Sequence, residues 1–322
     1  MDRKYAIITG FFGKLKDRFI DYQSVRSMEE ILEMVAKVKG CSGVEVVYPQ
    51  DFIDAAKLKK MLSGYDLKIS TVNLNIKSEE KFRYGSFSNP NQNVRKESIR
   101  YLERAMDCAA ELGCNIVTTA PLSDGADYPF ELDYERAFND TVEGIKEAAD
   151  YRSDVKISIE YKASEPRVHC LLNNAGKTAY LCNLIGRDNV GVTLDVGHAL
   201  QALEIPADTA AFLGTTEKLF YVHVNDNCRN WDWDQVPGTV NLWDQIEFAL
   251  YLKKVGYNGW ITADVFPQRH DPVKIMTKTF EWMDFIFDIA EKIDGKKLYE
   301  MMNSTEENTF EILDYIRSLF KS

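Results

Sequence analysis

The sequence of 322 residues has little of what marks several large protein classes. It contains only four histidines, and its 39 basic and 50 acidic side chains give a net charge of −11. An acidic surface repels nucleic-acid phosphates and anionic lipids. No apolar run approaches the ~20 residues that a transmembrane helix needs. We therefore expect neither a nucleic-acid-binding protein nor a membrane protein.

The chain also lacks the cysteine spacing of a disulfide framework. Its six cysteines are scattered, and no two of them form a Cys-x-x-Cys pair. In a chain of this length they indicate reduced thiols, and we expect a cytoplasmic protein. The apolar content of 45% is ordinary for a globular protein and excludes wholesale disorder.

Short β-branched runs alternate with amphipathic stretches along the chain. Eight strands are predicted, at Tyr5–Thr9, Val44–Val47, Lys68–Asn73, Ile116–Thr119, Lys156–Glu160, Val190–Asp195, Leu219–Val224 and Trp260–Asp264. Strand–helix alternation repeated eight times predicts parallel strands that close into a single (β/α)8 barrel over residues 1–295. A doubly wound open sheet is the alternative, but no GxGxxG follows the first strand.

Helical patterns occupy the segments between these strands. They lie near Ser27–Lys37, Lys57–Leu62, Asp133–Asp150, Thr178–Ile185, Leu242–Val255 and Pro272–Ile293, and a further helix ends at Gly113. Residues 296–322 are predicted as a C-terminal helical extension with an apolar stripe that includes Phe310 and Phe320. We interpret this extension as a cover for the bottom of the barrel or as a contact between subunits of a homo-oligomer.

Four consecutive predicted strands end in side chains that can bind a metal, namely Glu160, Asp195, His223 and Asp264. The carboxyl ends of parallel strands meet at one end of a barrel, and neighbouring strands are only ~4.8 Å apart. Unpaired charges are costly to bury, so these groups have to be paired or ligated. Three carboxylates and one imidazole suit Mn²⁺, Co²⁺ or Mg²⁺ better than zinc.

Motifs at the same four positions resemble those of xylose isomerase. They are Glu160-Tyr-Lys162-Ala-Ser-Glu165-Pro166 for E-x-K-x-x-E-P, Asp195-Val-Gly-His198 for acid-x-x-His, His223-Val-Asn225-Asp-Asn227 with Asp232-Trp-Asp234 for H-x-D-x-N…D-x-D, and Asp264-Val-Phe-Pro267 for D-x-x-P. All four occur in the family's order. The chain is identified as a member of the xylose-isomerase-like TIM-barrel superfamily, and its ligand pattern is most similar to that of L-rhamnose isomerase-type members.

The resemblance implies roles for individual residues. One metal would be held by Glu160, Asp195, His223 and Asp264. A second would be held by His198, Asp232 and Asp234, and the alternative for the two aspartates is a solvated turn. Glu160, Lys162 and Asp264 would be catalytic, and the substrate would also contact Glu165, Arg167 and His198. Apart from the resemblance, Trp231 is a candidate platform for a sugar face, with plain packing as the alternative. Two residues depart from the pattern, because Asn225 replaces an acid of xylose isomerase and Asp264 replaces the Glu that is usual in single-metal epimerases.

Two of these loop residues have ordinary alternatives. Lys162 would hold a substrate oxygen, and the alternative is a surface lysine. Arg167 would bind a substrate hydroxyl, and the alternative is an ion pair with Glu165. His169, in the same loop, is a candidate general base, and an exposed loop histidine is the competing interpretation.

The function expected from these features is that of a divalent-metal-dependent sugar isomerase or epimerase. The substrate would be an aldose, ketose or keto-sugar, and the reaction a hydride shift or a proton transfer through an enediolate. An alternative from the same superfamily is the catalytic subunit of a C-glycoside deglycosidase, which cleaves 3-keto C-glycosides with a small β-rich partner subunit and would use His169 as its base. A non-catalytic sugar-binding protein is a third hypothesis. Endonuclease IV-like enzymes share the barrel, but they need a histidine-rich zinc cluster and a basic face.

Overall fold

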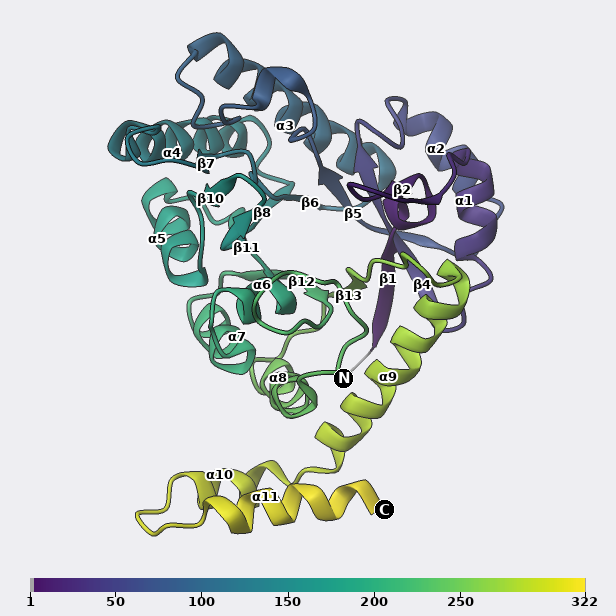
Figure 1. Ribbon diagram of the computed structural model, residues 1–322, viewed down its shortest axis with the longest axis vertical. Coiled ribbons are helices and arrows are strands. Elements are labelled where there is room, and N and C mark those ends of the chain that lie inside the picture. The colour runs from purple at the N-terminus through teal and green to yellow at the C-terminus, as the bar shows by residue number, and fades with distance from the viewer. Residues whose placement is uncertain (1–2, 322) are drawn as a thin grey trace.

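Eight parallel strands close into a barrel in the computed structural model, which describes residues 3–321 (Figure 1). The predicted domain limits at residues 1 and 322 lie outside the described residues. The barrel strands are β1 (Lys4–Ile8), β4 (Cys41–Tyr48), β5 (Lys68–Leu74), β6 (Ile116–Thr119), β8 (Lys156–Glu160), β11 (Val190–Asp195), β12 (Leu219–Val224) and β13 (Trp260–Ala263). Each strand pairs in parallel with the next, and β13 pairs with β1. The predicted (β/α)8 barrel is confirmed.

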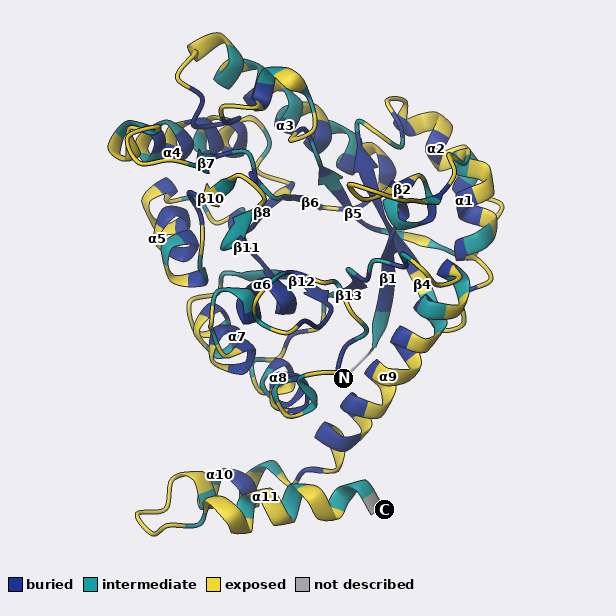
Figure 2. Cartoon of the chain, viewed as in Figure 1, coloured by how far each residue is buried: buried dark blue, intermediate teal, exposed yellow. Residues whose placement is uncertain are grey.

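Helices between the strands form the outer layer of the barrel (Figure 1). They are α1 (Met28–Val35), α2 (Ala55–Leu62), α3 (Gln92–Leu112), α4 (Tyr134–Tyr151), α5 (Ala175–Ile185), α6 (Val196–Gln201), α7 (Pro206–Thr215), α8 (Leu242–Lys254) and α9 (Pro272–Lys292). Local sequence sets their ends: Ser27 and Glu30 form a capping box at the start of α1, and Gly113 ends α3 in the left-handed region at φ 81°. Figure 2 shows the helix faces that turn toward the strands as buried.

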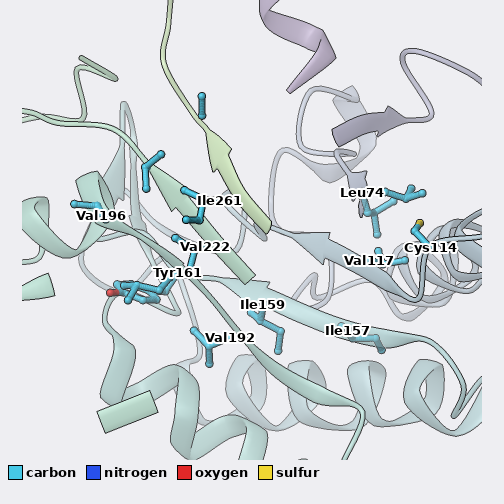
Figure 3. Close-up of a cluster of buried hydrophobic side chains, with 14 of the residues drawn as sticks. Leu74, Cys114, Val117, Ile157, Ile159, Tyr161, Val192, Val196, Val222 and Ile261 are labelled. Carbon is cyan, nitrogen blue, oxygen red and sulfur yellow. The ribbon is translucent and has the colours of Figure 1, made fainter. Parts of the chain in front are cut away.

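Side chains alternate between the two faces of each strand, and this alternation separates an apolar layer from a polar interior. Ile157 and Ile159 of β8 belong to the apolar cluster in Figure 3. Ser158 lies between them and hydrogen bonds Thr193 of the neighbouring strand at 2.7 Å. Across the barrel, the hydroxyl of Tyr221 on β12 donates to Ser70 on β5 at 2.8 Å. Polar side chains therefore fill the barrel centre.

Short 3-10 helices and short strands lie in the loops that follow the barrel strands. They are η1 (Thr9–Phe12), the hairpin of β2 (Leu15–Lys16) and β3 (Asp21–Gln23), η2 (Glu80–Phe82), and a sheet of β7 (Gly125–Ala126), β9 (Ser164–Glu165) and β10 (Val168–Cys170). A Cβ at residue 125 would lie 2.2 Å from the carbonyl oxygen of His169. Glycine is therefore what lets β7 pair with β10.

The C-terminal extension consists of α10 (Gly295–Met302), α11 (Thr309–Ser318) and η3 (Leu319–Lys321), and it lies beyond the end of α9 (Figure 1). The ring of Phe320 contacts Trp243 on α8 and Phe285 on α9, each at a centroid distance of 6.0 Å. These contacts place η3 beside the two helices. Within residues 3–321, no helix combines the length and the apolar composition needed to cross a membrane.

Candidate metal centre

The structure brings the four predicted ligands together at the carboxyl end of the barrel. Potential ligand atoms of Glu160, Asp195, His223 and Asp264 all lie within 4.8 Å of one another. His223 Nδ1 is 3.3 Å from Glu160 Oε1, 3.4 Å from Asp264 Oδ2 and 3.8 Å from Asp195 Oδ2. Strand register explains the convergence, because Asp195 lies opposite His223 in the β11–β12 pair. Barrel closure then places Glu160 at the end of β8 and Asp264 directly after β13, on either side of these two strands.

The charges of this cluster perturb one another. Burial alone would lower the pKa of the His223 imidazole, but Glu45 and Glu160 outweigh it and raise that pKa well above its ordinary value. Burial raises the pKa of Asp264 to about 8, His223 opposes this shift, and the carboxylates of Asp195 and Glu160 add to it. A divalent cation that binds here therefore displaces protons, so its affinity rises with pH.

Buried atoms without hydrogen-bond partners test whether these residues fit a cation. Within residues 3–321, His198 Nδ1 and Asp232 Oδ1 are buried and have no such partner. A buried lone pair without a donor is costly in an ordinary protein interior. Burial alone would lower the pKa of the His198 imidazole, but Asp195 and Asp232 outweigh it and raise that pKa well above its ordinary value, so His198 Nδ1, 3.2 Å from Glu160 Oε1, offers no free lone pair. The lone pairs of Asp232 Oδ1 and of the three carboxylates fit a hard divalent cation.

Glu45 on β4 belongs to the centre, although the sequence reasoning missed it. It is fully buried, and its Oε2 lies 2.9 Å from His223 Nε2, while Asn73 Nδ2 donates to its Oε1 at 2.6 Å. A carboxylate that accepts from one imidazole nitrogen leaves the lone pair on the other, which here faces the cluster. The sequence feature that could have identified Glu45 is its position between Val44 and Val46, as an acid in an otherwise apolar strand.

Replacing Glu45 with glutamine is expected to weaken metal binding by about 10–100-fold, the usual cost of losing such a partner. Asn73 occupies one carboxylate position as a donor, so the oxygen of the new amide faces Asn73 and its NH₂ group faces His223 Nε2. His223 then carries its proton on Nδ1, toward the metal. Competition with a chelating dye measures the affinity, and the exposed Glu217→Gln is the matched control. Equal affinities in both variants would contradict this role for Glu45.

Lys162, predicted as catalytic, lies in an ion-pair network beside the four ligands. Its Nζ is 2.8 Å from Glu165 Oε1 and 2.9 Å from Asp232 Oδ2. Lys162 is only 7% exposed, so the surface-lysine alternative is wrong. Burial alone would lower the pKa of Lys162, but Asp232 and Glu165 outweigh it and raise that pKa well above the ordinary value. The side chain therefore stays a cation.

His198 joins this network to the four ligands. Its Nδ1 lies 3.2 Å from Glu160 Oε1, and its Nε2 lies 3.1 Å from Asp232 Oδ2. Asp195 positions it, because Asp195 Oδ1 accepts the backbone N–H of His198 at 2.8 Å at the start of α6. Asp195, His198 and Asp232 also have potential ligand atoms within 4.8 Å of one another. This second group lacks Asp234, which the resemblance had included.

Both groups open into a cavity of about 670 Å³, a volume typical of small-molecule sites. Predicted residues in its wall are Glu160, Lys162, Glu165, His198, Asp232, Asp234 and Asp264. Phe11 and Phe266 add an edge-to-face aromatic pair with centroids 5.6 Å apart. The cavity wall thus combines acids, the cationic side chains of Lys14, Arg26, Lys77 and Lys162, and apolar ring surface. Such a wall can hold a polyhydroxylated molecule by hydrogen bonds and ring contacts.

Residues 32–286 match the family model described as "Xylose isomerase-like TIM barrel". The chain belongs to this family. It is 26% identical over 209 residues to the xylose isomerase of Thermus thermophilus, and the match covers 63% of this chain. The chain spans about half the length of that relative, with 54% covered.

Solved structures share the barrel. A D-allulose 3-epimerase from Methylomonas sp., in complex with D-allulose, superposes with a TM-score of 0.70 and 18% identity, over 88% of this chain and 96% of that chain. The IolI protein with a bound zinc atom superposes with a TM-score of 0.67 and 17% identity, over 90% of this chain and 100% of that chain. At these identities the likeness shows the fold.

Three predicted site residues lie away from the cavity of this xylose isomerase-like barrel. Arg167 is exposed and pairs with Asp127, not with Glu165. His169 on β10 is exposed, and Trp231 is half-buried outside the cavity wall. The β9–β10 hairpin explains the positions of Arg167 and His169. Its turn holds Arg167 at φ 73°, and its strand pairing turns the His169 imidazole outward. The loop thus contributes Lys162 and Glu165 to the cavity, but not its histidine.

Proposed function

We propose that the chain is a divalent-metal-dependent sugar epimerase or isomerase that removes a proton from a carbon next to the carbonyl of an aldose, ketose or keto-sugar and returns one to the same or the neighbouring carbon. The observation that carries the proposal is the cluster of Glu160, Asp195, His223 and Asp264 in a sugar-sized cavity beside Lys162. The relatives named xylose isomerase and D-allulose 3-epimerase support this class of substrate. The proposed cation is Mn²⁺, with Co²⁺ and Mg²⁺ as alternatives for the same donor set.

The four-residue cluster would hold the cation through its three carboxylates and His223 Nδ1. When bound, the cation would supply a Lewis acid that polarises a substrate carbonyl. Glu45 keeps the His223 lone pair directed to that position through its contact with Nε2. Lys162 donates to a substrate oxygen from the side of Asp232, and its fixed charge stabilises negative charge that develops there.

Glu160 and Asp264 are the acid–base pair of the proposed reaction. They come from β8 and from the residue after β13, on either side of His223. One carboxylate takes the proton from a C–H bond next to the carbonyl, and the electron pair of that bond forms the enediolate. In epimerisation, the other group returns a proton to the opposite face of the same carbon. In isomerisation, a proton returns to the neighbouring carbon, and the hydroxyl proton moves from one enediolate oxygen to the other. Each cycle ends with the protons redistributed between the two acids.

Turnover in deuterated water tests the reaction. The Mn²⁺-loaded protein is incubated with a panel of aldoses, ketoses and 3-keto glycosides, and NMR follows the product. We expect deuterium at the reacting carbon, because a carboxyl proton exchanges with solvent before it is returned. Protein stripped of metal with EDTA is the control and should give no product. Product without deuterium would indicate a hydride shift instead of proton transfer. If no sugar is turned over, the proposed function is overturned.

A further inference from the structure

We propose that Asn225 and Lys162 replace a second cation in the cavity, so that the chain binds one divalent ion, and that Asn225 sets this number. The inference rests on the proposed function, since it concerns the same cavity. The residues involved are the second group, Asp195, His198 and Asp232, and the neighbouring Asp234.

The orientation of the Asn225 amide is fixed by the backbone. Asn225 follows β12 and is fully buried, and the N–H of Gly197 donates to its Oδ1 at 2.6 Å. A Cβ at residue 197 would lie 2.4 Å from that oxygen, so glycine is required for the approach. Because Oδ1 accepts from the backbone, the NH₂ group has to face the other way. It donates to Asp195 Oδ2 and Asp234 Oδ1, each at 3.2 Å.

Asn225 therefore offers the acids two N–H donors and no ligand atom. A metal ion needs a lone pair, and the only oxygen of this side chain faces the N–H of Gly197, while the NH₂ group faces Asp195 and Asp234. An aspartate at the same position would keep one oxygen on Gly197 and present the other to Asp195 and Asp234. That change adds one negative charge and one ligand atom at a single point.

The ammonium group of Lys162 neutralises Asp232, the remaining acid of the second group. Its Nζ lies 2.9 Å from Asp232 Oδ2, on the oxygen that His198 Nε2 also contacts at 3.1 Å. A divalent ion ligated by this oxygen would lie next to the ammonium group, and the like charges repel. The ammonium of Lys162 and the amide of Asn225 thus occupy acids that a second ion would have to use. The four-residue cluster keeps His223 Nδ1 and the carboxylates of Glu160 and Asp264 for the first ion, and Asp195, whose Oδ2 accepts from Asn225, has further lone pairs to offer it.

Metal counting with Mn²⁺ tests the inference. Wild-type protein, Asn225→Asp, and Asn225→Asp with Lys162→Met are stripped, reloaded with excess Mn²⁺, desalted and analysed for manganese per chain. We expect one ion in the wild type and two in both Asn225→Asp and the double variant, with magnetic coupling between the two ions in the EPR spectrum. Asn225→Ala removes the donors without adding a ligand and should retain one ion. Asn75→Asp, which adds the same charge elsewhere in the cavity wall, should also retain one.

The outcomes separate this inference from the proposed function. Wild-type protein that binds no manganese would overturn both. Two ions in the wild type, or two in Asn75→Asp, would overturn the inference and leave the proposed function standing. A folded double variant that still binds one ion would also overturn it. If the variants do not fold, calorimetric titration of the wild type decides, because saturation at one ion up to millimolar Mn²⁺ supports the inference and a second event contradicts it.

Discussion

Replacing His223 with alanine is expected to remove the bound metal and the activity together. The imidazole supplies the only nitrogen ligand of the four-residue cluster, and its loss leaves the buried Glu45 without its partner. The affinity for Mn²⁺ should fall by more than the ~10–100-fold that an outer hydrogen-bond partner costs. Removing one member of a buried charge pair also costs roughly 3–5 kcal/mol of unfolding free energy. Metal analysis and chelator competition measure the loss of Mn²⁺ affinity, and thermal unfolding measures the loss of stability.

Two other histidines provide matched controls for this variant. His169 and His270 are exposed and lie outside the cavity wall. His169→Ala and His270→Ala should therefore retain metal content, stability and turnover. Full metal occupancy in His223→Ala would show that His223 is not a metal ligand. Loss of turnover in His169→Ala with metal still bound would instead indicate a loop histidine as general base, as in the deglycosidase alternative.

Replacing Asp264 with asparagine is expected to lower turnover by about 10²–10⁴-fold, the usual contribution of a general acid or base. The amide has nearly the same shape and can still offer an oxygen ligand, but it cannot carry a proton. At saturating Mn²⁺ the variant should bind metal and sugar while solvent deuterium enters the substrate far more slowly. Metal content, substrate affinity and the NMR exchange rate are measured on the same sample.

Asp271→Asn provides the control for a carboxylate-to-amide change in the same loop. Asp271 is the N-cap of α9, where its Oδ1 accepts from the N–H of Lys274 at 2.8 Å. Asparagine caps helices about as well as aspartate, so both fold and turnover should persist. Unchanged turnover in Asp264→Asn would show that the acid–base pair lies elsewhere in the cavity.

Strand positions and strand-end residues were accessible from the sequence. The bounds predicted for Ile116–Thr119, Lys156–Glu160, Val190–Asp195 and Leu219–Val224 are those of β6, β8, β11 and β12. Each run is short and rich in β-branched residues, so local pattern is enough. Once eight such strands close, register places the strand-end side chains at one end of the barrel. The meeting of Glu160, Asp195, His223 and Asp264 follows from local information and one topological rule.

The loops and the barrel interior were decided by tertiary structure. His169 and Lys162 belong to one loop, yet only Lys162 reaches the cavity, because β10 pairs with β7 at Gly125, more than forty residues earlier in the chain. The contact of Glu45 with His223 crosses the barrel between strands that are not neighbours. The orientation of Asn225 depends on the backbone N–H of Gly197 in α6. Each contact joins residues distant in sequence, and local periodicity carries no information about such pairings.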